Sequence, residues 1–252
     1  MKKYVVQSIE KISNSMRTGI IFLVNGKTHR LLLQKEDRSS GSASGSSAHC
    51  DFYLDGKKNR IPDSFLPGEN ETEKWELLYD IIDSVLLSLD PLRITDTWLA
   101  AHKAQYAKDI FLLDPNDIAF RKRTSTDKTD KMAADIKKNG WTGRPILVYT
   151  DTRNIYIALT GTHRIRAAWR AGLKEIPAVI IRCAEDNFTK LFEARDDKER
   201  ARIACKLYLK GEIPRTARDL LIEEEWENNK YNIQNMRSFM KEKEAIRANE
   251  SA

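Results

Sequence analysis

The stretch ALTGTHRIRAA at residues 158–168 decides the fold of the middle of this chain. A strand is predicted to end at Leu159 and a helix to begin near Thr162, with Gly161 between them. The first amides of such a helix have no intrahelical acceptor, and the helix macrodipole places partial positive charge beside them. Because Gly161 has no Cβ, an anion can approach the backbone closely. The stretch therefore predicts a turn that binds phosphate groups.

Four polar side chains follow directly after this glycine. The hydroxyl of Thr162 can cap the helix or bond a phosphate oxygen. His163 and Arg164 add donors in the first helical turn, and Arg166 adds a further one. A structural helix cap followed by a surface His-Arg pair would explain the same spacing about as well. The pattern alone therefore leaves both interpretations open.

The residues around the turn alternate between strand and helix patterns. Apolar runs predict strands, and Gly140 and Gly172 stand where a left-handed residue ends a helix. The alternation predicts a compact α/β unit. Its predicted strands are residues 110–113, 145–149, 155–159 and 178–181, and its predicted helices are one that starts near Asp127 and ends at Asn139 and one over residues 162–171.

Regions of different character flank this unit. Apolar runs around turn residues predict hairpins at residues 19–33 and 51–61, and apolar residues at helical spacing predict a helix over residues 71–89. Residues 187–209 and 215–226 have the charged pattern of helices. The predicted fold class is α+β, with an N-terminal β-hairpin plus helix domain at residues 1–107, an α/β domain at 108–183 and a helical C-terminal region at 184–252.

The positive charge is concentrated in one third of the chain. The net charge is +6, and residues 106–182 carry 15 Lys and Arg against 8 Asp and Glu, whereas the two flanking regions are close to neutral. Such a concentration favours an anionic partner, either a nucleotide or DNA. A solvated basic face is the alternative interpretation.

Composition excludes several classes of protein. No apolar run approaches the roughly 20 residues that a membrane span needs, and the first residues have no apolar stretch of signal-peptide length. The sequence therefore predicts a cytoplasmic protein with no membrane partner. The three cysteines Cys50, Cys183 and Cys205 are far apart, which argues against a disulfide framework and a zinc knuckle. The four histidines are also scattered, so the composition itself identifies no metal site.

The turn and its surroundings resemble the N-terminal domain of ParB, a member of the ParB/sulfiredoxin-like superfamily. The resemblance is carried by residues 145–148 and 157–180, and residues 114–123 fall where that family has its first conserved box. It extends over residues 109–182 and implies a nucleotide-binding fold. It implies nothing about the two ends of the chain.

The branches of this superfamily differ in their chemistry. ParB proteins bind and hydrolyse CTP with magnesium while they clamp DNA, and usually have Glu-Arg-Arg where this chain has Thr162-His163-Arg164. Sulfiredoxins bind ATP and use a cysteine at the position of Thr162, so the threonine excludes their chemistry. Related free-serine kinases commonly have an acidic residue where this chain has Thr160, which weakens that comparison.

Phosphoryl transfer by such a site would need phosphate neutralisation and a positioned proton acceptor. Asp127 and Asp130, at the start of the preceding helix, could hold Mg²⁺ or accept a proton, although simple helix capping would also explain them. His163 could contact the terminal phosphate or titrate near neutral pH. The predicted catalytic residues are His163, Asp127 and Asp130, and the predicted phosphate-binding residues are Gly161, Thr162, His163, Arg164, Arg166, Arg121 and Arg123.

Three functions remain open from the sequence. The first is an NTPase or phosphotransferase that uses ATP or CTP with Mg²⁺, acting on its own or at nucleic acid. The second is a DNA-binding or nuclease-like accessory protein of the ParB family, and the third is a module that senses a nucleotide without turnover. A helix–turn–helix could lie within residues 201–226, although the acidic run at residues 223–225 favours a role in packing or in forming a homo-oligomer.

Overall fold

The computed structural model describes residues 4–12, 17–35, 50–91, 107–120, 124–150 and 155–230. They divide into two compact units. The first comprises residues 1–86 with 209–211, and the second comprises residues 87–208 with 212–252. Residues 39–47, a Ser- and Gly-rich stretch, and residues 232–243 near the end of the chain lie outside the described residues.

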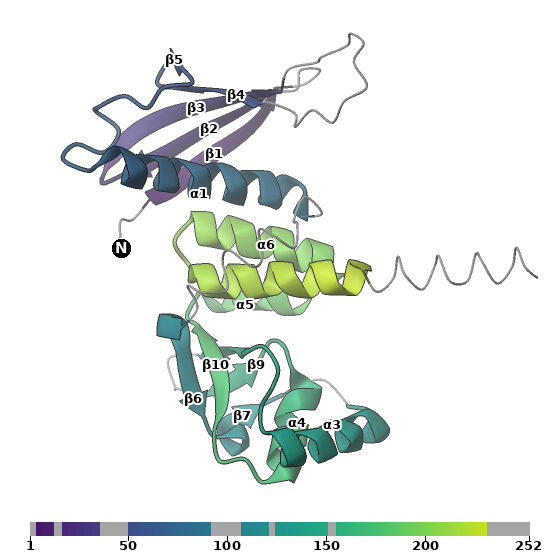
Figure 1. Cartoon of the computed structure of the whole chain (residues 1–252). Coiled ribbons are helices and arrows are strands. Elements are labelled where there is room, and N and C mark those ends of the chain that lie inside the picture. The colour runs from purple at the N-terminus through teal and green to yellow at the C-terminus, as the bar shows by residue number, and fades with distance from the viewer. Residues whose placement is uncertain are drawn as a thin grey trace, which may run out of the picture. The chain divides into compact units, whose positions relative to one another are not determined.

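The first unit is an antiparallel sheet packed against one helix (Figure 1). Its five strands follow one another in sequence order, and the helix α1 packs its apolar face on them. Phe22, Leu31 and Leu78 are among the buried side chains of this core. The elements are β1 (Tyr4–Ile12), β2 (Arg17–Val24), β3 (Lys27–Lys35), β4 (Cys50–Leu54), β5 (Lys57–Lys58) and α1 (Glu71–Leu89).

The two predicted hairpins are confirmed, and so is α1. Each hairpin turn has two residues in the left-handed region: Asn25 and Gly26 have φ of 50° and 80°, and Asp55 and Gly56 have φ of 49° and 81°. Positive φ at both central residues is typical of the turn that suits a two-residue hairpin. The first hairpin carries an additional strand, β1, which the sequence pattern did not predict.

The second unit contains a mixed sheet with the strand order β6-β10-β8-β9-β7. β10 pairs with β6 antiparallel and with β8 parallel, while β9 pairs with β8 antiparallel and with β7 parallel. The strands are β6 (Ile110–Leu113), β7 (Ile118–Ala119), β8 (Ile146–Thr150), β9 (Tyr156–Ala158) and β10 (Ile176–Ile181). Short 3₁₀ helices, η2 (Ala107–Asp109) and η3 (Pro115–Asp117), precede β6 and β7.

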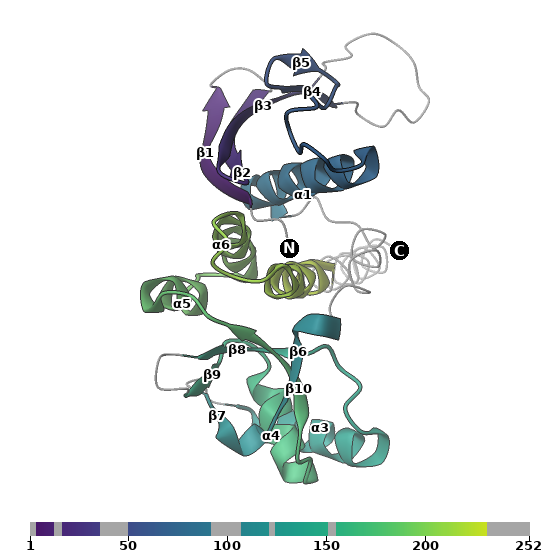
Figure 2. The same ribbon diagram turned by 90° about the vertical axis from the view of Figure 1, so that its left-hand side faces the viewer.

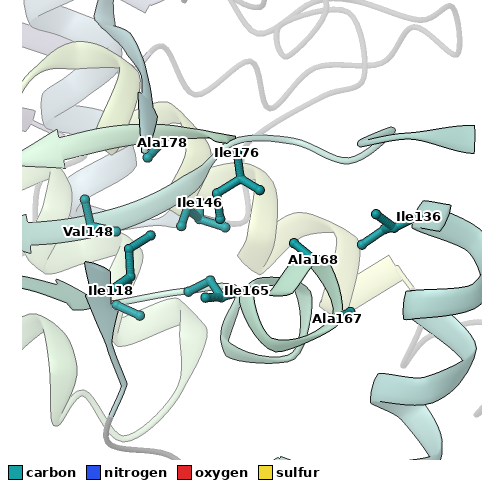
Figure 3. Close-up of a cluster of buried hydrophobic side chains, with 10 residues drawn as sticks. Ile118, Ile136, Ile146, Val148, Ile165, Ala167, Ala168, Ile176 and Ala178 are labelled. Carbon is teal, nitrogen blue, oxygen red and sulfur yellow. The ribbon is translucent and has the colours of Figure 1, made fainter. Parts of the chain in front are cut away.

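Two neighbouring helices cover one face of this sheet, as Figure 2 shows. They are α3 (Thr126–Asn139) and α4 (Thr162–Ala171). Figure 3 shows their core, in which Ile146 and Val148 of β8 and Ile176 of β10 pack toward Ile165 of α4. Because these residues are almost completely buried, the core fixes the first half of β8 against the first turn of α4.

The C-terminal part of the second unit is helical. It comprises α5 (Glu185–Phe192), α6 (Asp197–Leu209) and a helix over residues 215–230. The prediction of a single helix at residues 187–209 is wrong, because the helix is interrupted between Phe192, the last residue of α5, and Asp197, the first residue of α6. The Asp196 carboxylate accepts from the amide of Glu199 at 2.7 Å, and the Glu199 carboxylate accepts from the amide of Arg195 at 2.7 Å. This reciprocal capping starts α6.

The helix over residues 215–230 follows a turn at Gly211, which has φ of 73°. Its side chains pack inward: Arg218 is fully buried with its guanidinium 4.3 Å from the ring centre of Tyr208, and Ile222 joins a cluster with Ala201 of α6. A recognition helix must present its side chains to base edges. These contacts therefore favour packing over DNA reading for this helix. No helix of the described residues is both long and apolar enough to span a membrane.

Candidate phosphate-binding site

The predicted turn lies where the end of β9 meets the start of α4. The amides of Leu159 and Thr160 both donate to the carbonyl oxygen of Leu147 in β8, at 2.9 and 3.3 Å. The chain then reverses at Gly161, which has φ of 77° and ψ of 19°. Hydrogen bonds on the β8 side and helix formation on the other side thus fix the conformation of this glycine.

Gly161 has no room for a side chain. A Cβ at this position would lie 2.5 Å from Cγ2 of Ile146 and 3.3 Å from Nη2 of Arg164. Real Cβ atoms do not approach a carbon so closely, and the left-handed backbone would be strained with any other residue. Glycine is therefore required both by the conformation of the turn and by the packing of β8 beneath it.

The residue before the glycine faces the interior. Thr160 is buried, and its hydroxyl accepts a hydrogen bond from the amide of Leu147 at 3.2 Å. The side chain therefore extends the pairing of β8 with the end of β9. A threonine held in this way serves the fold of the turn, and its oxygen is directed away from the helix start.

The N-terminus of α4 has no side-chain cap. Gly161 is the N-cap residue, and its carbonyl oxygen accepts from the amide of Ile165 at 2.9 Å. The capping position is therefore occupied by Gly161 and not by Thr162, which is the first residue of α4. The amides of the first turn point away from the helix without intrahelical acceptors, as they do at any α-helix N-terminus. This leaves the backbone donors of Thr162 and His163 available to an anion.

The N-terminus of α3 lies beside that of α4. The amide of Ser125, the residue before α3, donates to Nε2 of His163 at 3.1 Å. Nη1 of Arg166 donates to the hydroxyl of Thr124 at 2.5 Å, and its guanidinium lies 5.4 Å from the ring centre of Phe120. Ser125 makes no side-chain cap to α3. Two helix N-termini without side-chain caps are thus joined by contacts from α4.

The contact with Ser125 defines the protonation state of His163. Because Nε2 accepts a hydrogen bond from an amide, it is unprotonated, and the neutral ring carries its proton on Nδ1. Burial lowers the pKa of His163 from its ordinary value, and the positive charge of Lys128 lowers it further. Both effects favour the neutral ring at neutral pH, with Nδ1–H as its donor.

Arg164 points beneath the turn. Its Nη1 donates to the carbonyl oxygen of Arg144, and its guanidinium lies 5.6 Å from the ring centre of Trp141. Burial lowers the pKa of Arg164, the neighbouring Arg144 lowers it as well, and nearby glutamates, Glu224 first among them, oppose this. The guanidinium therefore supports the glycine turn from below and places a positive charge there.

Arg144 and Trp141 belong to a segment that the sequence analysis did not identify. This segment connects α3 to β8, and the indole nitrogen of Trp141 donates to the carbonyl oxygen of Gly143 at 2.8 Å. A Cβ at Gly143 would lie 3.3 Å from Nη1 of Arg164. The signal in the sequence is the run Gly140-Trp141-Thr142-Gly143, in which Gly143 allows the chain to approach the Arg164 side chain closely.

The two predicted aspartates have different surroundings. Asp127 is exposed in the first turn of α3. Asp130 forms an ion pair with Arg170 of α4, which ties the two helices together. Among the described residues no group of three or more His, Cys, Asp and Glu side chains could hold a metal ion. The predicted Arg121 and Arg123 lie outside the described residues.

The family model described as the ParB N-terminal domain matches residues 101–192. A search of the curated proteins finds no match.

Similar solved structures come from several organisms. C-terminally truncated SbnI from Staphylococcus aureus is 22% identical, covers 29% of this chain and 31% of its own, and has a TM-score of 0.27. Sulfiredoxin from Arabidopsis thaliana is 21% identical, and the match covers 32% of this chain and 92% of the sulfiredoxin, with a TM-score of 0.28. A third structure is the C-terminally truncated chromosome-partitioning protein ParB from Caulobacter crescentus, complexed with CTP-gamma-S. It is 18% identical, and the match covers 45% of this chain and 84% of the ParB chain, with a TM-score of 0.27. The chain spans about a third of the length of the SbnI structure.

The family match and the sequence resemblance coincide on the same part of the chain. The family model includes the whole segment from β6 to β10, with the glycine turn between β9 and α4. Residues 101–192 of this chain therefore match the ParB N-terminal domain family, which supports the resemblance to the ParB/sulfiredoxin-like superfamily.

Proposed function

We propose that the chain binds a nucleoside triphosphate, ATP or CTP, through its phosphates at Gly161 and the adjoining helix starts, and that it acts as an NTPase or phosphotransferase. The observation that carries the proposal is the joining of two uncapped helix N-termini, α3 and α4, by the hydrogen bond between Ser125 and His163. The family match supports a nucleotide as the ligand, because the resemblance to ParB implies one.

The electrostatics of this arrangement favour a polyphosphate. Each helix N-terminus carries roughly half a positive charge and several free amide donors. Two such ends side by side can bind two phosphate groups, whereas one end suits a single group. Gly161 is the N-cap residue of α4, so the turn leads directly into the first amides of that helix, which have no intrahelical acceptors.

Several side chains around the turn would assist phosphate binding in different ways. The neutral ring of His163 would donate from Nδ1 to a phosphate oxygen, and Thr162 would donate from its hydroxyl. Arg164 supports the turn and adds charge beneath it, while Arg166 holds Thr124 beside the start of α4. Arg121 and Arg123 precede this segment in the sequence and remain proposed phosphate-binding residues.

Magnesium would accompany the nucleotide. Mg²⁺ in nucleotide sites is usually held by one or two carboxylates together with the phosphates, and it neutralises phosphate charge. Asp127 fits this requirement, because its carboxylate is exposed in the first turn of α3. Asp130 fits less well, because it is paired with Arg170. Of the two predicted aspartates, we therefore assign the metal contact to Asp127.

Calorimetric titration tests this proposal. ATP, CTP, GTP and UTP are titrated with and without Mg²⁺ into the wild type, Arg164→Ala and the control Arg182→Ala, which removes an exposed cation of the same domain. Selective binding that is weakened in Arg164→Ala and retained in Arg182→Ala supports the site. Release of phosphate or transfer to an acceptor identifies an enzyme, and saturable binding without product identifies a sensing module. Absence of binding by all four nucleotides overturns the proposal.

DNA is the second candidate ligand, since several of the lysines that give residues 106–182 their positive charge are exposed on α3. These are Lys128, Lys131, Lys137 and Lys138. Binding to backbone phosphates releases counterions, so the logarithm of the affinity falls steeply with the logarithm of salt concentration. Titration with duplex DNA between 50 and 200 mM salt, a range over which such binding falls by roughly 10³-fold or more, tests this candidate. A shallow salt dependence would remove it.

A further inference from the structure

Two glutamates of the helix over residues 215–230, Glu224 and Glu227, face Arg144 in the segment that supports the glycine turn. Oε2 of Glu227 lies 3.0 Å from Nη1 of Arg144, and Oε1 of Glu224 lies 3.9 Å from its Nη2. Glu224 and Glu227 are three residues apart on the helix over residues 215–230, so they lie on the same helix face. The Glu224 and Arg144 side chains are only 22% and 23% exposed, so the pair is shielded from much of the screening that weakens surface ion pairs.

Arg144 connects this helix to the turn through two different groups. Its side chain pairs with the two glutamates, while its backbone carbonyl oxygen accepts the hydrogen bond from Nη1 of Arg164. The same Arg164 guanidinium lies against Gly161, with Nη2 3.3 Å from the place of a Cβ. A continuous set of contacts therefore runs from Glu224 and Glu227 to the glycine turn.

Charge balance makes the glutamates necessary for this set of contacts. Arg144 and Arg164 are both cations and both are partly buried, and Arg144 disfavours the charge of Arg164. Glu224 and Glu227 oppose that repulsion. Removing them would leave this repulsion without compensation, and we expect Arg144 to shift in response.

We propose that Glu224 and Glu227 are positioning residues for the phosphate-binding turn, and that they act through Arg144 on Arg164. The inference rests on the proposed function and adds residues from the C-terminal helix to the site. It assigns a role to the two glutamates, which the predicted phosphate contacts leave unexplained.

If Glu224 and Glu227 are positioning residues, their removal should change nucleotide affinity in the direction opposite to that expected from charge alone. Removing two negative charges near the site raises the local positive potential, which by itself would tighten the binding of an anion. Removing two positioning residues instead displaces Arg144 and Arg164, which weakens binding. The sign of the change in nucleotide affinity therefore distinguishes a positioning role of the glutamates from a purely electrostatic effect.

The experiment uses the full chain and the nucleotide that the wild type binds best. Glu224→Gln with Glu227→Gln is compared with Glu193→Gln, which removes an exposed charge at the end of α5. We expect about tenfold weaker nucleotide binding in the double variant, in line with the coupling between residues in one ion-pair network, and unchanged binding in the control. Equal or tighter binding in the double variant overturns the inference.

A charge reversal separates positioning from general destabilisation. In a Glu224→Gln background, which removes the second carboxylate facing Arg144, Arg144→Glu and Glu227→Arg each break the pair, whereas the two together restore it with opposite signs and keep the backbone carbonyl that Arg164 uses. We expect each single variant to bind nucleotide about tenfold more weakly and the combined variant to recover most of the affinity. Failure of the combined variant to recover, when it is folded, contradicts the inference.

A signal from Trp141 reports on the turn without any ligand. With 5-fluorotryptophan incorporated, the ¹⁹F resonance that disappears in Trp141→Phe belongs to the ring beneath Arg164. We expect this resonance to shift in the Glu224→Gln, Glu227→Gln variant and to stay in place in Glu193→Gln. If the wild type binds no nucleotide, the proposed function fails. The resonance still decides whether the glutamates position Arg164, and an unshifted resonance overturns that role.

Discussion

The amide of Ser125 donates a hydrogen bond to Nε2 of His163 across 3.1 Å, and so joins the start of α3 to the first turn of α4. The bond exists only while Nε2 is unprotonated. Protonation would place an N–H opposite the Ser125 N–H and break this connection. The link between the two helices is therefore sensitive to pH.

His163 should make the stability of the domain fall in mild acid. Burial and Lys128 lower the pKa of His163 below its ordinary value of 6.5, so the unfolded chain binds the proton more readily than the folded chain. The contribution of His163 to the free energy of unfolding is complete above its ordinary pKa. It is lost as the pH falls below that value toward the lower pKa of His163 in the folded protein. Urea unfolding at pH 5, 6, 7 and 8 should show this loss in the wild type.

His163→Gln is the matched variant for that experiment. Its amide oxygen can accept from Ser125 at every pH, so its stability should depend less on pH between 5 and 7 than that of the wild type. The difference between the two proteins removes the contributions of other titrating groups. Identical pH dependence in the two would show that the histidine does not titrate with folding.

Gly161→Ala should destabilise the domain more than Gly172→Ala. Both glycines have a left-handed backbone, with φ of 77° and 79°, but a Cβ at Gly161 would meet Ile146 at 2.5 Å, whereas at Gly172 nothing lies within 4 Å. We expect a loss of about 3 kcal/mol at Gly161 and about 1 kcal/mol at Gly172. Chemical denaturation measures both, and equal losses would show that β8 does not pack tightly beneath the turn.

Thr160→Val should leave a buried amide without its partner. Valine has the shape of threonine but cannot accept from the amide of Leu147. Since Thr160 is buried, we expect a loss of about 1–2 kcal/mol in the free energy of unfolding. Thr160→Ser keeps the hydroxyl and should retain most of this hydrogen bond. If the valine variant is as stable as the serine variant, the hydroxyl contributes little to the turn.

Asp127 and Asp130 should differ in their dependence on magnesium. Asp127→Asn should weaken nucleotide binding in the presence of Mg²⁺ and change it little in its absence, because the carboxylate is proposed to hold the ion. Asp130→Asn should lower stability by under about 1 kcal/mol, since its pair with Arg170 is exposed, and should leave the Mg²⁺ dependence in place. Titrations with and without Mg²⁺ measure both, and the reversed pattern would reassign the metal contact to Asp130.

Local signals in the sequence were sufficient for much of the fold. The hairpin turns at Asn25-Gly26 and Asp55-Gly56 were predictable because only a few residues tolerate positive φ at successive positions. The start of α4 was predictable because a glycine separates an apolar run from a helical pattern. In each case a short segment determines its own conformation with little help from distant residues.

Other features depended on irregularities or on distant contacts. β1 was missed because a bulge between Val6 and Ser8 interrupts the alternation of apolar residues that identifies a strand. The break before α6 contains neither glycine nor proline, although the spacing of Asp196 and Glu199 is a capping signal that could have found it. The inward direction of Arg164 depends on a carbonyl oxygen 20 residues earlier in the chain, which no local pattern reveals.

The position of β10 has a consequence for how the domain forms on the ribosome. β10 lies between β6 and β8, and within the described sheet β6 pairs with no other strand. β6 is made early, at residues 110–113, but its partner at residues 176–181 emerges only when more than sixty further residues have been synthesised. Until then Phe111 and Leu112 belong to a strand without a neighbour, a species prone to association with other chains. Nascent chains stopped before Ile176 should therefore require a chaperone, and chains extended beyond Ile181 should be released from it.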